Sequence, residues 1–556
     1  MLTGIMEAKE AFVQKDKNPL VEYKMQISPA GYVFLGDRVT DVEGNIYAFN
    51  GKTSPLLIAA AMARLSRRGS DLREIFVDEF GMAGEKDASG LIHRVVTAYG
   101  DDSVQQLTGL HFVVEDASNL LTKMLEWGRF AAYLEQSTRY IYYDEKDKNG
   151  QYKYYVPADL DPETEAQYCR IHDQIFDLYS GMVHKLTRHV RKANPAPEDV
   201  REKIAWRGAT KAQACDTIRP VLPVSTRSTV GIYASAQAVE SLILHLLSED
   251  LLEARLAGQK ILEEARKVIP AFLERADKPD RGGATTAYRA NTRAAMSKLA
   301  KKYLPKESKD FDSEVKLIDY WPKNESEIIN HLLFAESNLS TAELEKAVRK
   351  LKKADKRRIF DTYMGKRLNR RHRPGRALEF PHYLWEVTAD YGTFRDLQRH
   401  RVIDGFEWQD LSTAYGYEVP ELVREAGLEQ DFHKCFELSE ELHQLMLQKK
   451  YVEEAQYATL FGHRMRYRFM LNARATFHFL ELRSSPQGHP GYRRICMQMH
   501  EQLKKVHPML ASAMRFVNQD EDPKLTRMAA ELATQYKLEK LDNLEKQAEA
   551  EMEKNQ

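Results

Sequence analysis

The sequence predicts a mixed α/β (α+β) fold in which two similar units follow each other along one chain. Three observations lead to this prediction. The chain has 556 residues, which is more than one ordinary hydrophobic core accommodates. Segments with the alternation of strands are interleaved with segments of helical periodicity. The same order of strand, amphipathic helix and basic segment also occurs twice, so we expect two domain-sized repeats.

The composition is that of a folded protein without an overall charge. Hydrophobic residues make up 43% of the chain and charged residues 29%, which is the balance of a soluble globular protein. The 82 Lys and Arg residues are matched by 82 Asp and Glu residues, so there is no global basic field of the kind that attracts nucleic acid. An anionic ligand must therefore be bound by local charges.

The cysteines and the apolar segments indicate in which cellular compartment the protein is expected. Cys169, Cys215, Cys435 and Cys496 form no C-x-x-C pair, so we expect neither a disulfide framework nor a metal site. The first residues contain no apolar run of signal-peptide length, and no segment approaches the roughly 20 apolar residues of a membrane span. We expect a cytoplasmic protein that does not associate with membranes.

Shifts in composition divide the chain into five segments. Residues 1–53 are an N-terminal extension, in which the apolar run from Tyr32 to Leu35 predicts a short strand. Residues 276–314 have the Pro, Gly, Lys and Ser content of a linker. The two repeats and a charged helical tail complete the chain, with boundaries at 54–275, 315–521 and 522–556.

In the first repeat, start signals and periodicity predict a helix, a strand and a second helix. Ser54 and Pro55 mark a helix start as N-cap and first helical residue. Residues 110–114 have the composition of a strand. Apolar residues from Ala117 to Leu125 then recur at the i, i+3, i+4 spacing of an amphipathic helix.

The second repeat follows the same plan. Residues 315–320 predict a strand, 326–354 predict helices, and 383–387 alternate as a strand does. A helix that ends at Arg399-His400-Arg401 comes next.

Two pairs of landmarks show that the copies differ in length. Trp127 and Arg399 are 272 positions apart, whereas Ser235 and Asn472 are 237 positions apart. The first copy therefore carries 35 more residues between Trp127 and Ser235 than the second copy carries between Arg399 and Asn472. Residues 160–205 predict the inserted helices that account for this difference.

A candidate site follows the amphipathic helix of the first repeat. If the segment that begins at Glu135 is extended, the side chains of Glu135, Ser137 and Arg139 point to one face. A carboxylate, a hydroxyl and a guanidinium on one face can bind a ligand that carries phosphate and hydroxyl groups.

Two segments of the second repeat contain further candidates, each with an ordinary structural explanation. Residues 472–483 combine core-facing and polar residues at helical spacing, as a surface helix does. The basic tripeptide 399–401 at a helix end is favoured by the helix macrodipole alone. Neither segment by itself distinguishes a site from a solvated surface.

Taken together, these motifs resemble those of the flavin-dependent thymidylate synthases. That family carries R-H-R-x-x-S-x-N-E-x-S-x-R-Y, then an Arg before a Leu-Pro segment, and then N-x5-N-x4-R on a helix. In the first copy, Trp127-Gly128-Arg129 occupies the place of R-H-R, and Ser235, Ser241 and Leu246 replace N-x5-N-x4-R. The residues of this copy that match the family pattern are Glu135, Ser137, Arg139, Tyr140 and Arg219.

The second copy shows the opposite losses. Arg399-His400-Arg401 is intact, whereas Glu407, Gln409 and Leu411 replace the following positions and Gln456 replaces the later Arg. The spacing N-x5-N-x4-R is kept by Asn472, His478 and Arg483, with His in place of the second Asn.

The first copy thus resembles the nucleotide half of the family's site and the second copy resembles the flavin half. Active sites of this family lie at subunit interfaces and take residues from more than one chain. The resemblance implies two family-type units, each a mostly antiparallel sheet flanked by helices, that jointly build a composite site. It also implies a homodimer that mimics the family's tetramer of single repeats.

The resemblance implies a role for each matching residue. Arg139 and Arg219 would hold the phosphate of dUMP, and Glu135 and Ser137 would bind its sugar and phosphate or shape the pocket. Arg483 would polarise the pyrimidine carbonyl from the other copy, which makes Arg483 and Arg139 the candidate catalytic residues. The implied flavin ligands are Arg399, His400, Arg401, Asn472 and His478.

The implied reaction is the methylation of dUMP to dTMP. Methylenetetrahydrofolate donates the carbon, and reduced FAD, regenerated by NADPH, supplies the hydride. This reaction needs no cysteine nucleophile, which agrees with the absence of a recognised catalytic setting around the four cysteines.

Two other functions stay open at the level of sequence. The incomplete motifs also fit a catalytically inactive relative that binds nucleotide or flavin and acts as a regulator. The basic run from Lys366 to Arg373 suggests nucleic-acid binding as an alternative function. The zero net charge and the lack of interleaved aromatic residues instead favour a folate-facing or phosphate-facing loop or a solvated surface.

Overall fold

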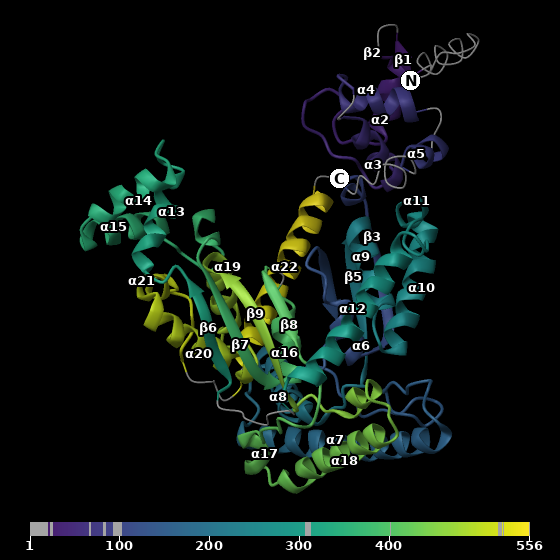
Figure 1. Ribbon diagram of the computed structural model, residues 1–556, viewed down its shortest axis with the longest axis vertical. Helices are drawn as coiled ribbons and strands as arrows, with labels where there is room; N and C mark the ends of the chain where they lie inside the picture. Colours follow the sequence, from purple (N-terminus) through teal and green to yellow (C-terminus); the bar gives the residue numbers. More distant parts are fainter. Residues whose placement is uncertain are drawn as a thin grey trace. The chain divides into compact units, whose positions relative to one another are not determined.

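The computed structural model confirms a mixed fold of helices and mostly antiparallel strands (Figure 1). The chain forms two compact units whose borders cross those of the sequence repeats, because segments of both repeats contribute to the second unit. The residues that the structure describes are 20–22, 26–65, 68–81, 85–92, 103–305, 313–400, 402–520, 525 and 527–554.

The two units are discontinuous in sequence. The first comprises Met1–Glu115, Met124–Glu135 and Thr229–Lys306. The second comprises Asp116–Lys123, Gln136–Ser228 and Glu307–Gln556.

The first unit contains most of a three-stranded sheet with the strand order β3-β5-β4. Strands β4 and β5 pair antiparallel, with Ala131 opposite Ala234 and Glu135 opposite Val230. The last residues of β3 and the first residues of α6 already belong to the second unit. The strands are β1 (Val21–Glu22), β2 (Gln26–Ile27), β3 (Gly109–Ser118), β4 (Ala131–Glu135) and β5 (Arg227–Ser235). The helices are α2 (Pro29–Gly36), α3 (Pro55–Arg64), α4 (Leu72–Ile75), η2 (Phe76–Phe80), α5 (Glu85–Ile92), η4 (Val104–Leu107), α6 (Asn119–Leu125), α9 (Ala236–Leu247), α10 (Leu252–Val268), α11 (Pro270–Leu273) and α12 (Gly282–Tyr303).

The sequence predicts a strand from Tyr32 to Leu35. This prediction is wrong, because these residues lie in helix α2. Ser28 caps this helix by accepting a hydrogen bond from the backbone N–H of Gly31, and Pro29 takes its first position. These start signals outweigh the strand propensity of the apolar residues that follow. The interval with linker composition, 276–314, contains the 22-residue helix α12.

The second unit contains a four-stranded sheet with the order β6-β7-β9-β8, in which all neighbours are antiparallel (Figure 1). The order β7-β9-β8 reproduces β3-β5-β4 of the first repeat, and β6 adds an edge strand. The duplicated plan read from the sequence is therefore present in the topology. These strands are β6 (Val315–Trp321), β7 (His382–Asp390), β8 (Gly405–Trp408) and β9 (Arg464–Asn472).

One face of this sheet is covered by two helices that carry candidate residues, α16 (Tyr391–Gln398) and α19 (Ala473–Arg483). The ring of Phe394 on α16 lies 5.1 Å from that of Tyr467, and Phe479 on α19 lies 5.7 Å from Phe469. Because β7 and β9 are antiparallel, the helices that follow them start at opposite ends of the sheet and run toward each other. Their C-terminal ends consequently meet.

The helices inserted in the first repeat belong to the second unit, where α7 packs against α8 and α18. The C-terminal helix α22 packs along α8. The helices of this unit are α7 (Pro162–Ala193), α8 (Val200–Ile218), η5 (Arg219–Val221), η6 (Glu325–Glu327), α13 (Ile328–Phe334), α14 (Thr341–Lys350), α15 (Lys353–Met364), η7 (Arg376–Glu379), α16, α17 (Glu421–Glu425), α18 (Glu429–Gln448), η8 (Glu454–Ala458), α19, α20 (Pro490–Val506), α21 (Pro508–Ala513) and α22 (Met528–Lys554).

Within the described ranges, no helix combines the length and the apolarity that crossing a bilayer requires. The same ranges contain no cluster of three or more His, Cys, Asp or Glu side chains arranged to hold a metal ion.

Candidate functional site

A cavity of about 450 Å³ in the second unit collects residues from both repeats. This volume falls within the range of roughly 300–1,000 Å³ that is usual for small-molecule sites. The segment after β4, the helices α16, α19 and α20, and the start of α22 contribute to its wall. The lining residues are Ser137, Arg139, Tyr140, Asp396, Arg399, Arg483, Gln487, Tyr492, Arg527, Ala530 and Glu531.

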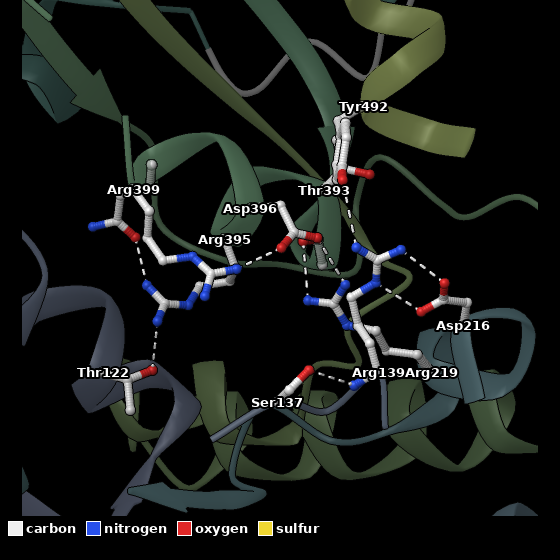
Figure 2. A network of polar contacts seen from close by, with 12 residues as sticks. Thr122, Ser137, Arg139, Asp216, Arg219, Thr393, Arg395, Asp396, Arg399 and Tyr492 are labelled. Atoms are coloured by element: carbon white, nitrogen blue, oxygen red, sulfur yellow. Dashed lines mark hydrogen bonds and ion pairs between the residues drawn. The ribbon is translucent and has the colours of Figure 1, made fainter. Parts of the chain in front are cut away.

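Arg139 is held in the cavity wall by a bidentate ion pair with Asp216. Its Nε and Nη2 donate to the two carboxylate oxygens at 2.7 Å each, while Nη1 lies 3.4 Å from the hydroxyl of Tyr492. Figure 2 shows these contacts around the guanidinium. Asp216 thus fixes one edge of the guanidinium, and the other edge keeps N–H donors for a ligand.

Asp216 occupies an unusual position for a carboxylate, close to the C-terminal end of α8. The helix macrodipole disfavours a negative charge there, and burial would raise the pKa of this group. The charge and hydrogen bonds of Arg139, together with the charge of Arg527, instead hold the pKa of Asp216 below its usual value. Asp216 is therefore ionised at neutral pH and able to orient two guanidinium groups.

The second carboxylate of the site, Asp396, lies on α16. The Asp390 side chain caps this helix by accepting from the N–H of Thr393 at 2.8 Å. Asp396 accepts from Nη1 of Arg219 at 3.0 Å and from Nη2 of Arg399 at 2.5 Å (Figure 2). Burial opposes ionisation, but the charges of Arg219 and then Arg399 keep the pKa of Asp396 well below its usual range.

Arg483, the last residue of α19, lies near the same aromatic ring as Arg139. The guanidinium carbon of Arg483 lies 5.5 Å from the centroid of the Tyr492 ring, and that of Arg139 lies 5.8 Å from it. Nε of Arg483 is buried and has no hydrogen-bond partner within the described structure. A buried donor without a partner is costly in a folded protein, so this atom indicates a place for a ligand acceptor.

The expectation that Glu135 to Tyr140 is extended is only partly right. Strand β4 ends at Glu135, and Thr138 to Tyr140 form a turn. The Ser137 hydroxyl accepts a hydrogen bond from the backbone N–H of Arg139 at 3.2 Å. This local bond stabilises the turn in place of a sheet ladder and directs Ser137 and Arg139 into the cavity.

The candidate flavin residues His400 and His478 form a second cluster. Their ring centroids lie 5.0 Å apart. Burial, followed by the charges of His478, Arg483 and Arg373, lowers the pKa of His400 to about 3. Burial and the charges of Arg373, Arg370 and Arg483 lower the pKa of His478 to about 4. Both rings are consequently neutral at pH 7.

The basic run of the sequence is partly directed inward to this cluster. Nη2 of Arg373 lies 3.3 Å from Nε2 of His478, a geometry in which the guanidinium donates to a neutral imidazole. Arg367 is buried and pairs with Glu481 on α19, which fixes the loop against that helix. Nε2 of His400 is buried without a hydrogen-bond partner among the described residues.

Asn472 is the N-cap of α19. Its Oδ1 accepts from the N–H of Ala475 at 2.8 Å, and its Nδ2 lies 3.5 Å from Oδ2 of Asp404. In the first repeat, Ser235 caps α9 in the same way by accepting from the N–H of Ala238. The sequence equivalence of Ser235 and Asn472 thus corresponds to equivalent positions in the fold.

The predicted residues fall into three groups. Ser137, Arg139, Arg399 and Arg483 line the cavity, and Arg219 reaches it through Asp396. His400 follows α16, Asn472 caps the start of α19 and His478 lies in its middle; none of the three is among the lining residues. Glu135 ends β4 in the first unit and is not among the lining residues, and Arg401 lies outside the described residues.

Sequence reasoning missed Asp216, Asp396, Tyr492 and Arg527. Asp396 had a usable signal, because it precedes Arg399 by three residues on a helix, the spacing of an ion pair. Asp216 and Tyr492 belong to no motif of the resemblance. Arg527 lies in the segment 522–556, whose charge content predicts a solvated helical tail.

The site has an excess of positive charge. In the described part of the chain, five guanidinium groups and three carboxylates line the cavity or pair with its lining residues, so positive groups outnumber negative ones. Such a gathering of guanidinium groups in a confined site favours an anionic ligand. The groups are Arg139, Arg219, Arg399, Arg483 and Arg527, with Asp216, Asp396 and Glu531.

The comparison with known families matches both repeats. The family described as thymidylate synthase complementing protein matches residues 51–271 and 316–509. A UPF0159 protein of Chlamydia muridarum is 30% identical over 506 residues, which cover 88% of this chain and 94% of that protein. A UPF0159 protein of Chlamydia pneumoniae is 31% identical over 504 residues, which cover 87% of this chain and 94% of that protein.

Among solved structures, a UMP/dUMP methylase PolB from Streptomyces cacaoi, bound with 5-Br dUMP, is similar to part of the chain. It is 18% identical, with a TM-score of 0.31, and the match covers 38% of this chain and 96% of that one.

Proposed function

Because the chain belongs to the family of thymidylate synthase complementing proteins, over both of its repeats, we propose that it is a flavin-dependent thymidylate synthase that converts dUMP to dTMP. Membership of the family supports a methyltransferase-like enzyme acting on a nucleotide. The finer proposal is supported by one observation: Arg139 of the first repeat and Arg483 of the second line the same cavity.

In this proposal the cavity binds the nucleotide. The phosphate of dUMP is held by the free edge of Arg139 and by Ser137, which the turn after β4 directs toward it. Nε of Arg483, which has no partner among the described residues, donates a hydrogen bond to the nucleotide and polarises the pyrimidine carbonyl, stabilising the charge that develops when the ring is attacked. Asp216 and Asp396 are positioning residues, since they orient the guanidinium groups rather than contact the substrate.

The residues beside the cavity fit a flavin. Among the described residues, the buried Nε2 of His400 has no hydrogen-bond partner, and Arg373 and Arg370 place positive charge near His478 that suits a diphosphate. Arg399, His400, Asn472 and His478 are thus the proposed FAD-binding residues, with Arg401 as in the family pattern. When bound, reduced FAD supplies the hydride, NADPH regenerates it, and methylenetetrahydrofolate supplies the carbon.

We also propose that the chain forms a homodimer, because a two-repeat chain can reproduce the family's tetramer of single repeats with two molecules. One chain has a mass of 64.2 kDa. Light scattering on the purified protein should therefore give twice this mass, and a monomer that retains full activity would argue against the dimer.

Growth rescue of a thymidine-requiring bacterial strain tests the proposed function. The wild-type gene should restore growth without thymidine, and Arg139→Ala should not, because it removes a phosphate ligand and leaves the buried Asp216 with only its longer contact to Arg527 among the guanidinium groups described. A strain that produces soluble wild-type protein and still requires thymidine would contradict the proposal.

Assays on the purified protein distinguish this proposal from the alternative that the chain is a catalytically inactive relative. Purified protein should have a flavin absorption spectrum and form dTMP from dUMP when methylenetetrahydrofolate and NADPH are supplied. Arg139→Ala should keep the flavin spectrum, whereas His400→Ala should lose it. Protein that binds dUMP and flavin but forms no dTMP would identify a binding protein instead of an enzyme.

A further inference from the structure

The C-terminal segment contributes to the cavity although it lies beyond both stretches that match the family, 51–271 and 316–509. Helix α22 begins at Met528, and the residue before it, Arg527, lines the cavity together with Ala530 and Glu531. The Arg527 side chain is only 4% exposed. A charged side chain is rarely buried to this extent unless it is paired or binds a ligand.

The contacts of Arg527 leave part of its guanidinium available. Nη2 lies 3.3 Å from Oδ2 of Asp216, the same oxygen that accepts from Arg139 at the shorter distance of 2.7 Å. The guanidinium carbon lies 4.2 Å from the centroid of the Tyr140 ring, a cation–π contact. Nε is buried and has no hydrogen-bond partner in the described structure.

The segment is also fixed against the unit that holds the cavity. Along α22, Glu539 pairs with Arg201 of α8 at 3.2 Å, and the Tyr536 ring lies 5.9 Å from the Arg201 guanidinium carbon. Helix α8 is the element that carries Asp216 near its other end. The packing of α22 along α8 therefore determines where Arg527 meets the cavity.

We propose that Arg527 binds the phosphate of the nucleotide, so that the C-terminal segment is part of the substrate site. The proposal rests on the proposed function for the identity of the nucleotide. Asp216 already neutralises Arg139, so one carboxylate serves two guanidinium groups and the second positive charge needs another anion. A phosphate carries about 1.5 to 2 negative charges at neutral pH, so it can pair with Arg527 and also with the edge of Arg139 that faces away from Asp216.

Calorimetric titration with dUMP and with deoxyuridine, which lacks the phosphate, tests this role. Arg527→Gln should weaken dUMP binding roughly 10- to 100-fold, the effect of losing a hydrogen bond between charged groups. Its binding of deoxyuridine should equal that of the wild type. The matched control is Arg357→Gln, which breaks an exposed ion pair with Asp361 away from the cavity lining and should leave both titrations unchanged.

A second variant covers a failure to fold. If the circular dichroism of Arg527→Gln shows unfolding, Arg527→Lys keeps the charge but loses the planar donor fork, and it should weaken dUMP binding by a smaller factor. A folded Arg527 variant that binds dUMP as the wild type does would overturn the inference. So would equal losses of dUMP and deoxyuridine binding, which indicate a structural role.

The same titrations keep the two proposals apart. Wild-type protein that binds UMP or dCMP in place of dUMP, with Arg527→Gln weaker for that nucleotide, would refute the proposed substrate and support the phosphate role. Wild-type protein that binds no nucleoside monophosphate would refute both.

Discussion

Arg139 shows how one ion pair can contribute to folding and to binding together. The bidentate pair with Asp216 compensates the burial of both groups and fixes the guanidinium in one orientation. Burial would lower the pKa of Arg139, but the charge and hydrogen bonds of Asp216 raise it well above its ordinary value. A ligand therefore meets a charged and already oriented donor, which reduces the entropy that binding loses.

The buried pair of Arg367 and Glu481 allows a quantitative prediction of stability. Their side chains are 5% and 0% exposed, so Arg367→Met leaves a carboxylate buried without its partner. We expect the free energy of unfolding in urea to fall by about 3–5 kcal/mol.

The matched control for Arg367 is Arg357→Met. Arg357 pairs with Asp361 one helical turn away, but these side chains are 48% and 51% exposed, so the loss should be at most about 1 kcal/mol. Equal effects of the two substitutions would show that the buried pair does not stabilise the loop on α19.

At the scale of single residues, the sequence located cavity residues wherever a motif preserved them. Ser137, Arg139, Arg399 and Arg483 were found in this way, although their individual roles stay predictions. Their carboxylate partners were not found, because Arg139 and Asp216 lie 77 positions apart and Arg219 and Asp396 lie 177 apart. Only the fold brings such pairs together.

Among the elements, helix α19, which follows β9, contributes both to the stability of the fold and to the candidate site. Asn472 caps α19, and α19 carries His478 and Arg483 at its middle and its end. The proposed flavin contact of Asn472 therefore has to be separated from its role as a cap.

The first repeat supplies the variant that separates these roles, because Ser235 caps α9 in the equivalent position. Asn472→Ala should lower the free energy of unfolding by about 1 kcal/mol, whereas Asn472→Ser should stay close to the wild type. Both variants should lose flavin during gel filtration if the amide group contacts it. Retention of flavin by Asn472→Ser would restrict Asn472 to capping.

Elements with strong start signals and clear periodicity were predicted correctly, as α3 from Ser54 and Pro55 and strands β3, β6 and β7 show. The apolar run in α2 was misread because four residues cannot distinguish a strand from a short capped helix. Helix α6 starts two residues later than its apolar pattern, since β3 continues to Ser118.

For the whole molecule, the division into repeats and the division into compact units differ. The strand orders β3-β5-β4 and β7-β9-β8 record the duplication. The inserted helices α7 and α8 nevertheless belong to the second unit, and α8 brings Asp216 there. Because these segments of the first repeat belong to the second unit, that unit alone contains candidate residues of both repeats. Sequence periodicity could not reveal it, because it depends on long-range packing.

The central claim is that residues from both repeats bind one nucleotide. The most direct measurement is a calorimetric titration of dUMP into the wild type, Arg139→Gln, Arg483→Gln and the double variant. Each single substitution should weaken binding by roughly 1.5–3 kcal/mol, and the loss in the double variant should differ from the sum by about 0.5 kcal/mol or more, because both side chains contact one ligand. A folded single variant that binds dUMP with wild-type affinity would contradict the claim.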